Sequence, residues 1–392
     1  MKILIVGAGI AGPTLAYWLR RAGHVPVIVE HATELRRGGY AVDFWGAGFE
    51  VAERMGLAPR LHQEGYRFRE AREVSDSGRR IAHFDPLRLI DGYGGGYVTI
   101  LRSDLSAAIW DALEGEVETV FDDTVRSLHD DGERVLVEFL HGAPQEFDLV
   151  IGADGLHSRV RSLAFGPEPE FSRDLGITVA AFDLDGYRPR DELVAVTHTV
   201  VGSLTLRIGL RDDSTMFCFM FRHDGETPQD DRVAQQQLLR ERLRNVGWEV
   251  PAILEQMPQA RTFFMDRASQ ILLPSWSHGR IALVGDAAAA PSLLAGQGSA
   301  LAMVEAYVLA CALHEAGGDH RAAFAAFQSQ LHGIVRAKQN AAIGMGSAFA
   351  PRNHAQVLLR NVAIGLMNIP LVANLAIGRS LRDPIVLPTP PG

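Results

Sequence analysis

Cysteine is scarce in this chain: Cys218 and Cys311 are the only two, and both stand inside apolar stretches. Two isolated thiols cannot build a disulfide framework, and they do not have the spacing of a thiolate metal site. We therefore expect two buried free thiols, no bound metal, and a reducing, cytoplasmic location.

Positive charge and long apolar runs are also lacking. The 38 basic side chains are outnumbered by 47 acidic ones, and the formal net charge is −9. No basic run interleaved with aromatic residues occurs, which argues against a nucleic-acid partner. Residues 358–378 are apolar, but Arg360, Asn368 and Pro370 interrupt them, whereas a spanning helix needs about 20 mostly apolar residues. We expect a buried or surface-packed C-terminal helical segment and no integral membrane protein, with contact at a membrane surface as the alternative.

The most informative stretch is the first thirty residues of the 392. The apolar run 2–6 leads into Gly7-Ala8-Gly9-Ile10-Ala11-Gly12, then come apolar residues at helical spacing and a second apolar run that ends at Glu30. Strand, glycine turn, helix and acid-terminated strand are typical of the unit that holds the ADP half of a dinucleotide. We therefore expect a nucleotide cofactor.

Each part of this pattern has a physical reason. Gly7 permits the tight turn, Gly9 lets the backbone approach a pyrophosphate, and Gly12 lets the helix pack closely on the strand. The first N–H groups of the helix face the phosphates. Glu30 is placed to accept hydrogen bonds from a ribose.

Two later strand ends resemble the first one. The strand expected at 147–151 leads to Asp154-Gly155, with Arg161 soon after, and the apolar run 281–284 leads to Gly285-Asp286. The carboxyl ends of parallel strands meet at one edge of a sheet, so we expect a Rossmann-like α/β domain in which these turns supply further cofactor contacts.

A glycine loop follows the third strand end. Gly296-Gln297-Gly298 precedes a long apolar helix that begins near Ser299. The two glycines would let the backbone lie against a planar ring, and the positive end of the helix would point at that ring.

Three further residues could contact the cofactor. Arg36 and Arg37 stand beside a glycine pair in the loop after Glu30, which leads on to Asp43. Arg102 opens a helix after the glycine cluster 92–96. These arginines could contact phosphates or cover a flat ring; a solvated turn and a surface arginine are the alternatives.

The character of the chain changes from about residue 170 to 264, where strands rich in β-branched and aromatic residues follow one another. An antiparallel sheet with one face over a cavity accounts for this pattern. We expect a discontinuous nucleotide-binding domain (1–65, 100–168 and 270–318), an inserted substrate domain (66–99 and 169–269) and a C-terminal helical segment (319–392).

Pocket residues are harder to assign. His198, Arg207 and Phe219 are candidates because they stand in or beside the strands of this sheet. A lone histidine in a sheet is as readily structural, so no catalytic acid or base is assigned. Phenylalanines at 217, 219 and 221 alternate with Met216, Cys218 and Met220, and the alternation leaves open which set lines the cavity.

The three strand ends together resemble the flavin monooxygenases of the p-hydroxybenzoate hydroxylase type, closest to the branch with the tetracycline-inactivating monooxygenases and the aromatic-polyketide hydroxylases. The resemblance covers nearly the whole chain. It implies a glutathione-reductase-like FAD-binding domain with an inserted antiparallel sheet and C-terminal helices. It implies FAD contacts at Gly7, Gly9, Ala11, Gly12, Glu30, Arg36, Arg37, Asp43, Arg102, Asp154, Gly155, Arg161, Asp286, Pro291, Gly296, Gln297, Gly298 and Ser299.

Within that set the resemblance gives each segment a role. The first motif and Glu30 hold the ADP moiety, and the segment from Asp154 to Arg161 serves the pyrophosphate and NAD(P)H. Asp286 binds the ribityl chain, and residues 296–298 lie beside the isoalloxazine.

The chain also departs from the family pattern. Ala289 replaces a common histidine, Pro291 stands one place early, and Ala300 and Glu305 replace a frequent asparagine and aspartate. These changes reshape the loop between flavin and substrate, so the substrate of a relative does not transfer.

The resemblance implies that NAD(P)H reduces FAD, that O2 adds to give a C4a-hydroperoxide, and that one oxygen passes to an aromatic or polycyclic small molecule by hydroxylation or insertion. The alternatives are a flavoprotein that binds or sequesters an aromatic ligand, an isoprenoid reductase, and a halogenase. A halogenase would need a lysine near the flavin and a Trp-x-Trp-x-Ile-Pro signature, which residues 247–251 lack. We expect a monomer or weak dimer.

Overall fold

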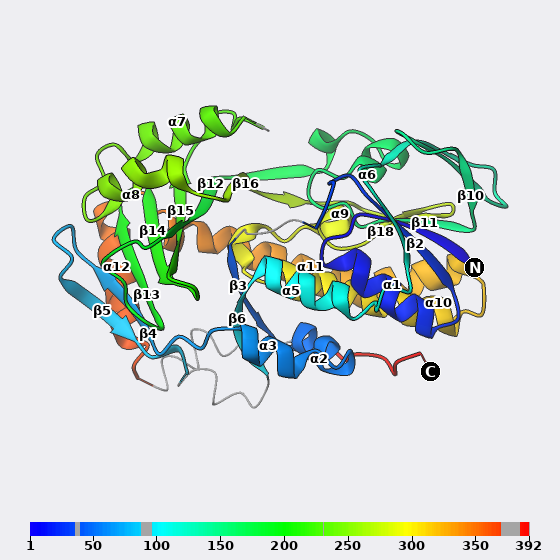
Figure 1. Cartoon of the computed structure of the whole chain (residues 1–392), viewed down its shortest axis with the longest axis horizontal. Helices are drawn as coiled ribbons and strands as arrows, with labels where there is room; N and C mark the ends of the chain where they lie inside the picture. The colour runs from blue at the N-terminus through cyan, green and yellow to red at the C-terminus, as the bar shows by residue number, and fades with distance from the viewer. Residues whose placement is uncertain (36–39, 88–95, 230, 370–384, 392) are drawn as a thin grey trace.

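The computed structural model describes residues 1–35, 40–87, 96–229, 231–369 and 385–391. It has two lobes, each built on its own sheet, with a long helix packed against both (Figure 1).

The sheet of the first lobe has six strands in the order β17-β18-β11-β1-β2-β7, all parallel except β17. They are β1 (Lys2–Val6), β2 (Val25–Glu30), β7 (Glu118–Phe121), β11 (Leu149–Gly152), β17 (Ser277–His278) and β18 (Ile281–Leu283). Apolar side chains of β1, β11 and β18 are fully buried, as in a parallel sheet covered on both faces. Because these three strands are neighbours, the turns that follow them leave from one edge of the sheet.

Helices enclose this sheet. Helix α1 (Ala11–Arg21) packs on β2, and α10 (Gly298–Glu315) packs on α1, where the rings of Trp18 and Tyr307 meet edge to face with centroids 4.9 Å apart. Residues 300–313 of α10 are all buried, as expected for a helix that is apolar on every side. The other elements of this lobe are β3 (Ala41–Trp45), α2 (Ala47–Arg54), α3 (Ala58–Glu64), β6 (Tyr97–Leu101), α5 (Arg102–Asp111), β8 (Val125–Asp130), β9 (Val135–Phe139), β10 (Gln145–Phe147), α6 (Arg159–Ala164), η1 (Glu168–Glu170), α9 (Asp286–Ala289) and η3 (Leu293–Ala295).

The sheet of the second lobe has seven strands in the order β16-β12-β15-β14-β13-β4-β5, antiparallel except for the pair β4 and β13. They are β4 (Glu70–Val74), β5 (Arg80–Phe84), β12 (Ser172–Asp185), β13 (Val194–Val200), β14 (Ser203–Gly209), β15 (Ser214–Arg222) and β16 (Phe263–Ile271). One face, here called the outer face, is covered by α7 (Arg232–Leu243), α8 (Val250–Gln256) and η2 (Met257–Gln259). The opposite, inner face packs against residues of the first lobe.

The C-terminal part links the lobes. Helix α11 (His320–Phe349) packs on α10 of the first lobe and on β12 and α12 (His354–Leu366) of the second. The described part of 358–378 is helical to Leu366 and lies on the surface; residues 370–378 lie outside the described ranges. Residues 385–391 return to the first lobe, where Arg54 and Tyr307 each donate to the Pro388 carbonyl at 2.6 Å. Among the described helices, none has the length and hydropathy needed to cross a bilayer.

This architecture confirms the expected α/β fold with a second sheet and C-terminal helices. The second sheet draws its strands from 70–84 and 172–271. The proposed domain boundaries stay a prediction. Both cysteines are free and buried.

Candidate active site

The glycine turn after β1 is shaped by close backbone packing. Gly7 has φ +110°, and a Cβ there would lie 2.5 Å from the carbonyl oxygen of Ala153. A Cβ on Gly12 would lie 1.9 Å from the carbonyl oxygen of Gly7. At Gly9 the nearest atom to such a Cβ is Arg102 Nη2, at 3.6 Å. Gly7 and Gly12 are therefore required by the protein's own packing, whereas Gly9 faces open space that a phosphate can approach.

Glu30, at the end of β2, is bonded to this turn. Its Oε2 accepts the N–H of Ala8 at 2.6 Å, and its Oε1 accepts the N–H of Ala32 at 2.9 Å. A carboxylate has about four acceptor positions, so about two stay open for ribose hydroxyls.

The aspartate of the second motif caps a helix. Asp154 Oδ2 accepts the N–H groups of Arg159 at 2.8 Å and Val160 at 3.0 Å, and Oδ1 accepts the Ser158 hydroxyl at 2.5 Å. Burial raises the pKa of Asp154, and these hydrogen bonds oppose the shift. The next residue, Gly155, has φ +81° and no atom within 4 Å of where a Cβ would stand. The aspartate thus fixes the turn, and the glycine leaves its outer side open.

Arg161 is not placed to contact a cofactor, which corrects the sequence prediction. Its side chain is fully buried, and its guanidinium donates to the carbonyls of Ala287 at 3.1 Å and Leu156 at 2.6 Å and to Glu168 at 2.8 Å. It therefore ties the second strand end to the third.

The third motif brings Asp286 against the first. Gly285 has φ +63°, and a Cβ there would lie 3.3 Å from the Cβ of Ala11. Burial raises the pKa of Asp286 and the charge of Arg102 lowers it, while no described residue donates a hydrogen bond to the carboxylate. A half-buried carboxylate that accepts no hydrogen bond from the described residues fits a hydroxyl-bearing chain such as ribityl.

Arg102 and Tyr40 stand where the lobes meet. The backbone N–H of Arg102 donates to the Tyr40 carbonyl at 3.1 Å, and the Tyr40 ring lies 5.2 Å from that of Phe264 on β16. Burial raises the pKa of Tyr40 to about 12, with Arg102 opposing the shift and Asp286 adding to it. Sequence reasoning missed Tyr40, although its place directly after a glycine pair was a usable signal. Arg36 and Arg37 lie outside the described residues.

The loop between α9 and α10 carries the remaining predicted contacts. Pro291 is buried, Ser292 has the unusual φ of +91°, and Gly296 is left-handed at φ +63°. A Cβ on Gly298 would lie 3.8 Å from Asp286 Oδ1, so the start of α10 adjoins the acid. Gln297 precedes this helix, and Ser299 lies in its first turn.

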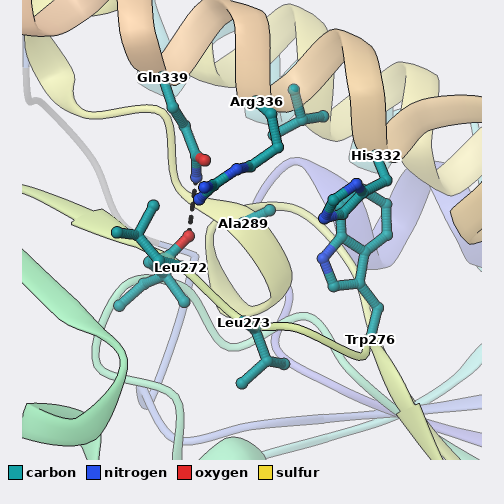
Figure 2. Close-up of a pocket in the computed structure, with 9 residues that line it drawn as sticks. Leu272, Leu273, Trp276, Ala289, His332, Arg336 and Gln339 are labelled. Carbon is teal, nitrogen blue, oxygen red and sulfur yellow. Dashed lines mark hydrogen bonds between the residues drawn. The ribbon is translucent and has the colours of Figure 1, made fainter.

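Ala289, where the family commonly has histidine, lines a shallow pocket with Trp276, His332 and Arg336 (Figure 2). Two of these residues come from α11.

Asp43 forms its hydrogen bonds within the β3–β6 pair. Its Oδ1 accepts the hydroxyls of Tyr97 and Thr99, both at 2.6 Å, across the β3–β6 pair. It makes no hydrogen bond to the described residues of the three strand ends.

The three pocket candidates all lie on the outer face of the seven-stranded sheet, away from the face that packs against the first lobe. Phe219 stacks on Phe182 at 5.5 Å beneath α7 and α8. His198 Nε2 lies 2.8 Å from Asp76 Oδ1. Arg207 is 4% exposed and pairs with Glu249 at 2.7 Å and with Asp191. Their side chains pack the core or fasten α8.

The inner face of the sheet carries the residues of β15 that alternate with the three phenylalanines. Met216, Cys218 and Met220 pack there with Phe264 and with Leu293 of the glycine loop. This face is apolar and stands over the glycine loop. It is the side of the sheet suited to a flat, apolar ligand.

Comparisons with known proteins agree with this geometry. The family described as FAD binding domain matches residues 1–323. An uncharacterised protein of Mycobacterium tuberculosis is 38% identical over 86% of this chain and 92% of its own. A flavin-dependent monooxygenase from an unknown prokaryotic organism is 34% identical over 89% of this chain and 90% of its own. Among solved structures, the tetracycline destructase Tet(55) superposes with a TM-score of 0.84 at 31% identity, covering 99% of this chain and 98% of that one.

The chain belongs to the FAD-binding-domain family, in its group of flavin-dependent monooxygenases. The family resemblance, the enzyme class and the FAD cofactor expected from the strand ends are thereby confirmed.

Proposed function

We propose that this protein uses NAD(P)H and O2 to add one oxygen atom to a flat, largely apolar aromatic or polycyclic molecule held between the glycine loop and the inner face of the seven-stranded sheet. The observation that supports this proposal best is that Gly9, Arg102 and Asp286 lie together at one edge of the parallel sheet, next to the apolar inner face of the seven-stranded sheet.

The residues present fit FAD. Gly9 leaves room for a pyrophosphate in front of α1, whose first N–H groups favour anions. Glu30 and Asp286 offer open acceptor positions for ribose and ribityl hydroxyls. The glycines at 296 and 298 leave the backbone bare beside the ring.

Bound FAD supplies the oxygen-transfer chemistry, and the protein supplies binding, orientation and exclusion of water. Arg102 balances the buried negative charge of Asp286. Met216, Cys218 and Phe264 form a largely apolar wall, in which the Met216 sulfur already accepts the N–H of Ala41 at 3.3 Å, so substrate selection there rests on shape and apolar contact. The helix end at Gly298 adds a partial positive charge of about half a unit.

A panel of aromatic compounds tests the proposal. Purified protein loaded with FAD is assayed for substrate-stimulated NAD(P)H consumption, and products are identified by mass. We expect at least one polycyclic phenol to gain a single oxygen. Tight ligand binding without turnover, or a product that gains halogen or hydrogen, would contradict the proposal in favour of a sequestering protein, a halogenase or a reductase.

A further inference from the structure

Helix α12 turns its large apolar side chains toward solvent. They recur at a spacing that places them on one side of the helix, within an arc of about 100°. These side chains, here called the α12 stripe, are Leu358 (66% exposed), Leu359 (69%), Val362 (50%), Leu366 (42%) and, just after the helix, Ile369 (48%). A continuous set of exposed apolar side chains marks a surface that meets a partner or a membrane.

The opposite side of α12 is held on the protein by polar groups. Arg360 pairs with Glu73 of β4 at 2.6 Å and donates to the carbonyl of Ala348 at 2.9 Å. The side-chain oxygen of Asn361 is also buried on this side. A surface helix normally buries its apolar side and exposes its polar side, so the orientation of α12 is reversed. The helix lies at the outer end of the second lobe, beside β5 (Figure 1).

The C-terminal region that contains the stripe has no negative side chains of its own. Residues 320–382 contain no aspartate or glutamate, so all 47 acidic side chains of the chain stand elsewhere. The basic side chains in this range are Arg321, Arg336, Lys338, Arg352, Arg360, Arg379 and Arg382. In a chain with a net charge of −9, this region is suited to an anionic surface.

The charges beside the stripe agree with this pattern. Arg352 is exposed just before the start of α12. The two acids of the neighbouring strand β4 are paired, Glu73 with Arg360 and Glu70 with Arg72 at 2.7 Å. A second copy of the chain would bring the same positive charges together, which disfavours it as the partner of this surface.

We propose that the α12 stripe docks this protein on an anionic phospholipid bilayer, with α12 lying in the headgroup region and not crossing it. An apolar helix side accompanied by basic side chains is typical of helices that lie in a membrane interface. The leucines of the stripe would enter the boundary of the acyl chains, and Arg352 would meet the lipid phosphates. Docking of this kind does not depend on the reaction that the protein catalyses.

The test is co-flotation of the purified full chain, with FAD added, with two kinds of vesicle. One is phosphatidylcholine alone, and the other is equal parts of phosphatidylcholine and phosphatidylglycerol. We expect the protein to float with the second kind, and less so as salt is added. The double variant Leu358→Gln/Leu359→Gln should lower the partition coefficient about tenfold or more, because two large apolar side chains are lost from the lipid contact. Its melting temperature should stay near that of the wild type, since both side chains are exposed and glutamine is a good helix former.

Two further variants separate the apolar and the charged contributions. Arg352→Gln should weaken binding to the anionic vesicles about fivefold. Val233→Gln is the matched control, because Val233 is 75% exposed on α7, away from the stripe, and it should bind as the wild type does. Wild-type protein that does not float with the anionic vesicles, or a double variant that floats equally well, would overturn the inference. A lipid-free dimer that the double variant loses would also overturn it, in favour of a second copy on the stripe.

Discussion

The carboxyl group of Glu305 accepts the backbone N–H of Gly285 at 2.6 Å, so the middle of helix α10 is bonded to the glycine that precedes Asp286. Glu305 is 1% exposed. Burial raises its pKa well above the usual 4.5, with the Gly285 hydrogen bond opposing and the nearby Asp286 adding to the shift. Compared with a carboxyl group in water, Glu305 therefore holds its proton more tightly at the point where the third strand end meets α10.

Glu305→Gln should therefore be tolerated and Glu305→Ala should not. The amide keeps an acceptor for Gly285, whereas alanine leaves a buried N–H unpaired and a cavity, costing about 2–4 kcal/mol. The free energy of unfolding in urea measures both. Equal destabilisation of the two variants would contradict this role.

The same residue predicts a pH dependence. Because the folded state holds the proton more tightly, its contribution to stability is fully present below the unfolded pKa of 4.5 and is lost as pH rises toward the folded pKa. Glu305→Gln should remove this part of the pH dependence of the unfolding free energy above pH 4.5. A curve parallel to that of the wild type would contradict the shift.

Gly9 and Gly12 should respond differently to alanine. Gly12→Ala places a Cβ 1.9 Å from a carbonyl oxygen, so it should lose both folding stability and FAD binding. Gly9→Ala meets only an ordinary contact with Arg102, so its melting temperature should stay near that of the wild type. Its FAD affinity should fall about tenfold or more, because the methyl group occupies the approach of the phosphates. Fluorescence titration with FAD and thermal melting separate the two effects; normal FAD affinity in Gly9→Ala would contradict the placement.

Substitutions at two adjacent residues of β15, Phe219 and Met220, should affect stability and substrate binding separately. Phe219→Leu alters the outer core and should cost about 1 kcal/mol of unfolding free energy with an unchanged KM. Met220→Ala alters the inner face and should change KM several-fold with an active substrate of the panel. If Phe219→Leu changed KM and Met220→Ala changed only the free energy of unfolding, the pocket would lie on the outer face, which would contradict this account.

His157 links the second motif to the substrate sheet. It lies 3.0 Å from Glu168 and 3.3 Å from Asp266 of β16, and these hydrogen bonds raise its pKa to about 10. Stability from this raised pKa is fully present below the unfolded value of 6.5 and is lost as pH rises through about 10.

His157→Gln should therefore destabilise most at pH 6 and hardly at all above pH 10. The side chain is 52% exposed, so the loss should stay within about 1 kcal/mol. Exposed His129 on β8, changed to glutamine, is the control. A deficit that is independent of pH would show that the charge of His157 is not involved.

The strand ends and the fold were predictable because their signals are local. An apolar run followed by Gly7 or by Asp154 is written in a few consecutive residues, and parallel strands bring such ends to one edge. Which residues of β15 face the helices was not predictable. The alternation of side chains defines two faces of the strand but does not show which face the helices cover. Arg161 was misjudged for a related reason, because a motif position does not reveal whether a side chain is buried. The hydrogen bond from Lys338 of α11 to Gln297 was not predictable either, because it forms only once α11 has packed on the loop.

The central claim is that one FAD spans the three strand ends of a single chain. Titration of flavin-free protein with FAD, followed by flavin fluorescence, tests it most directly. The account predicts saturation at one FAD per chain, with affinity strongly reduced when Asp286 is changed to alanine. Binding that does not saturate, or that is indifferent to Asp286, would contradict it.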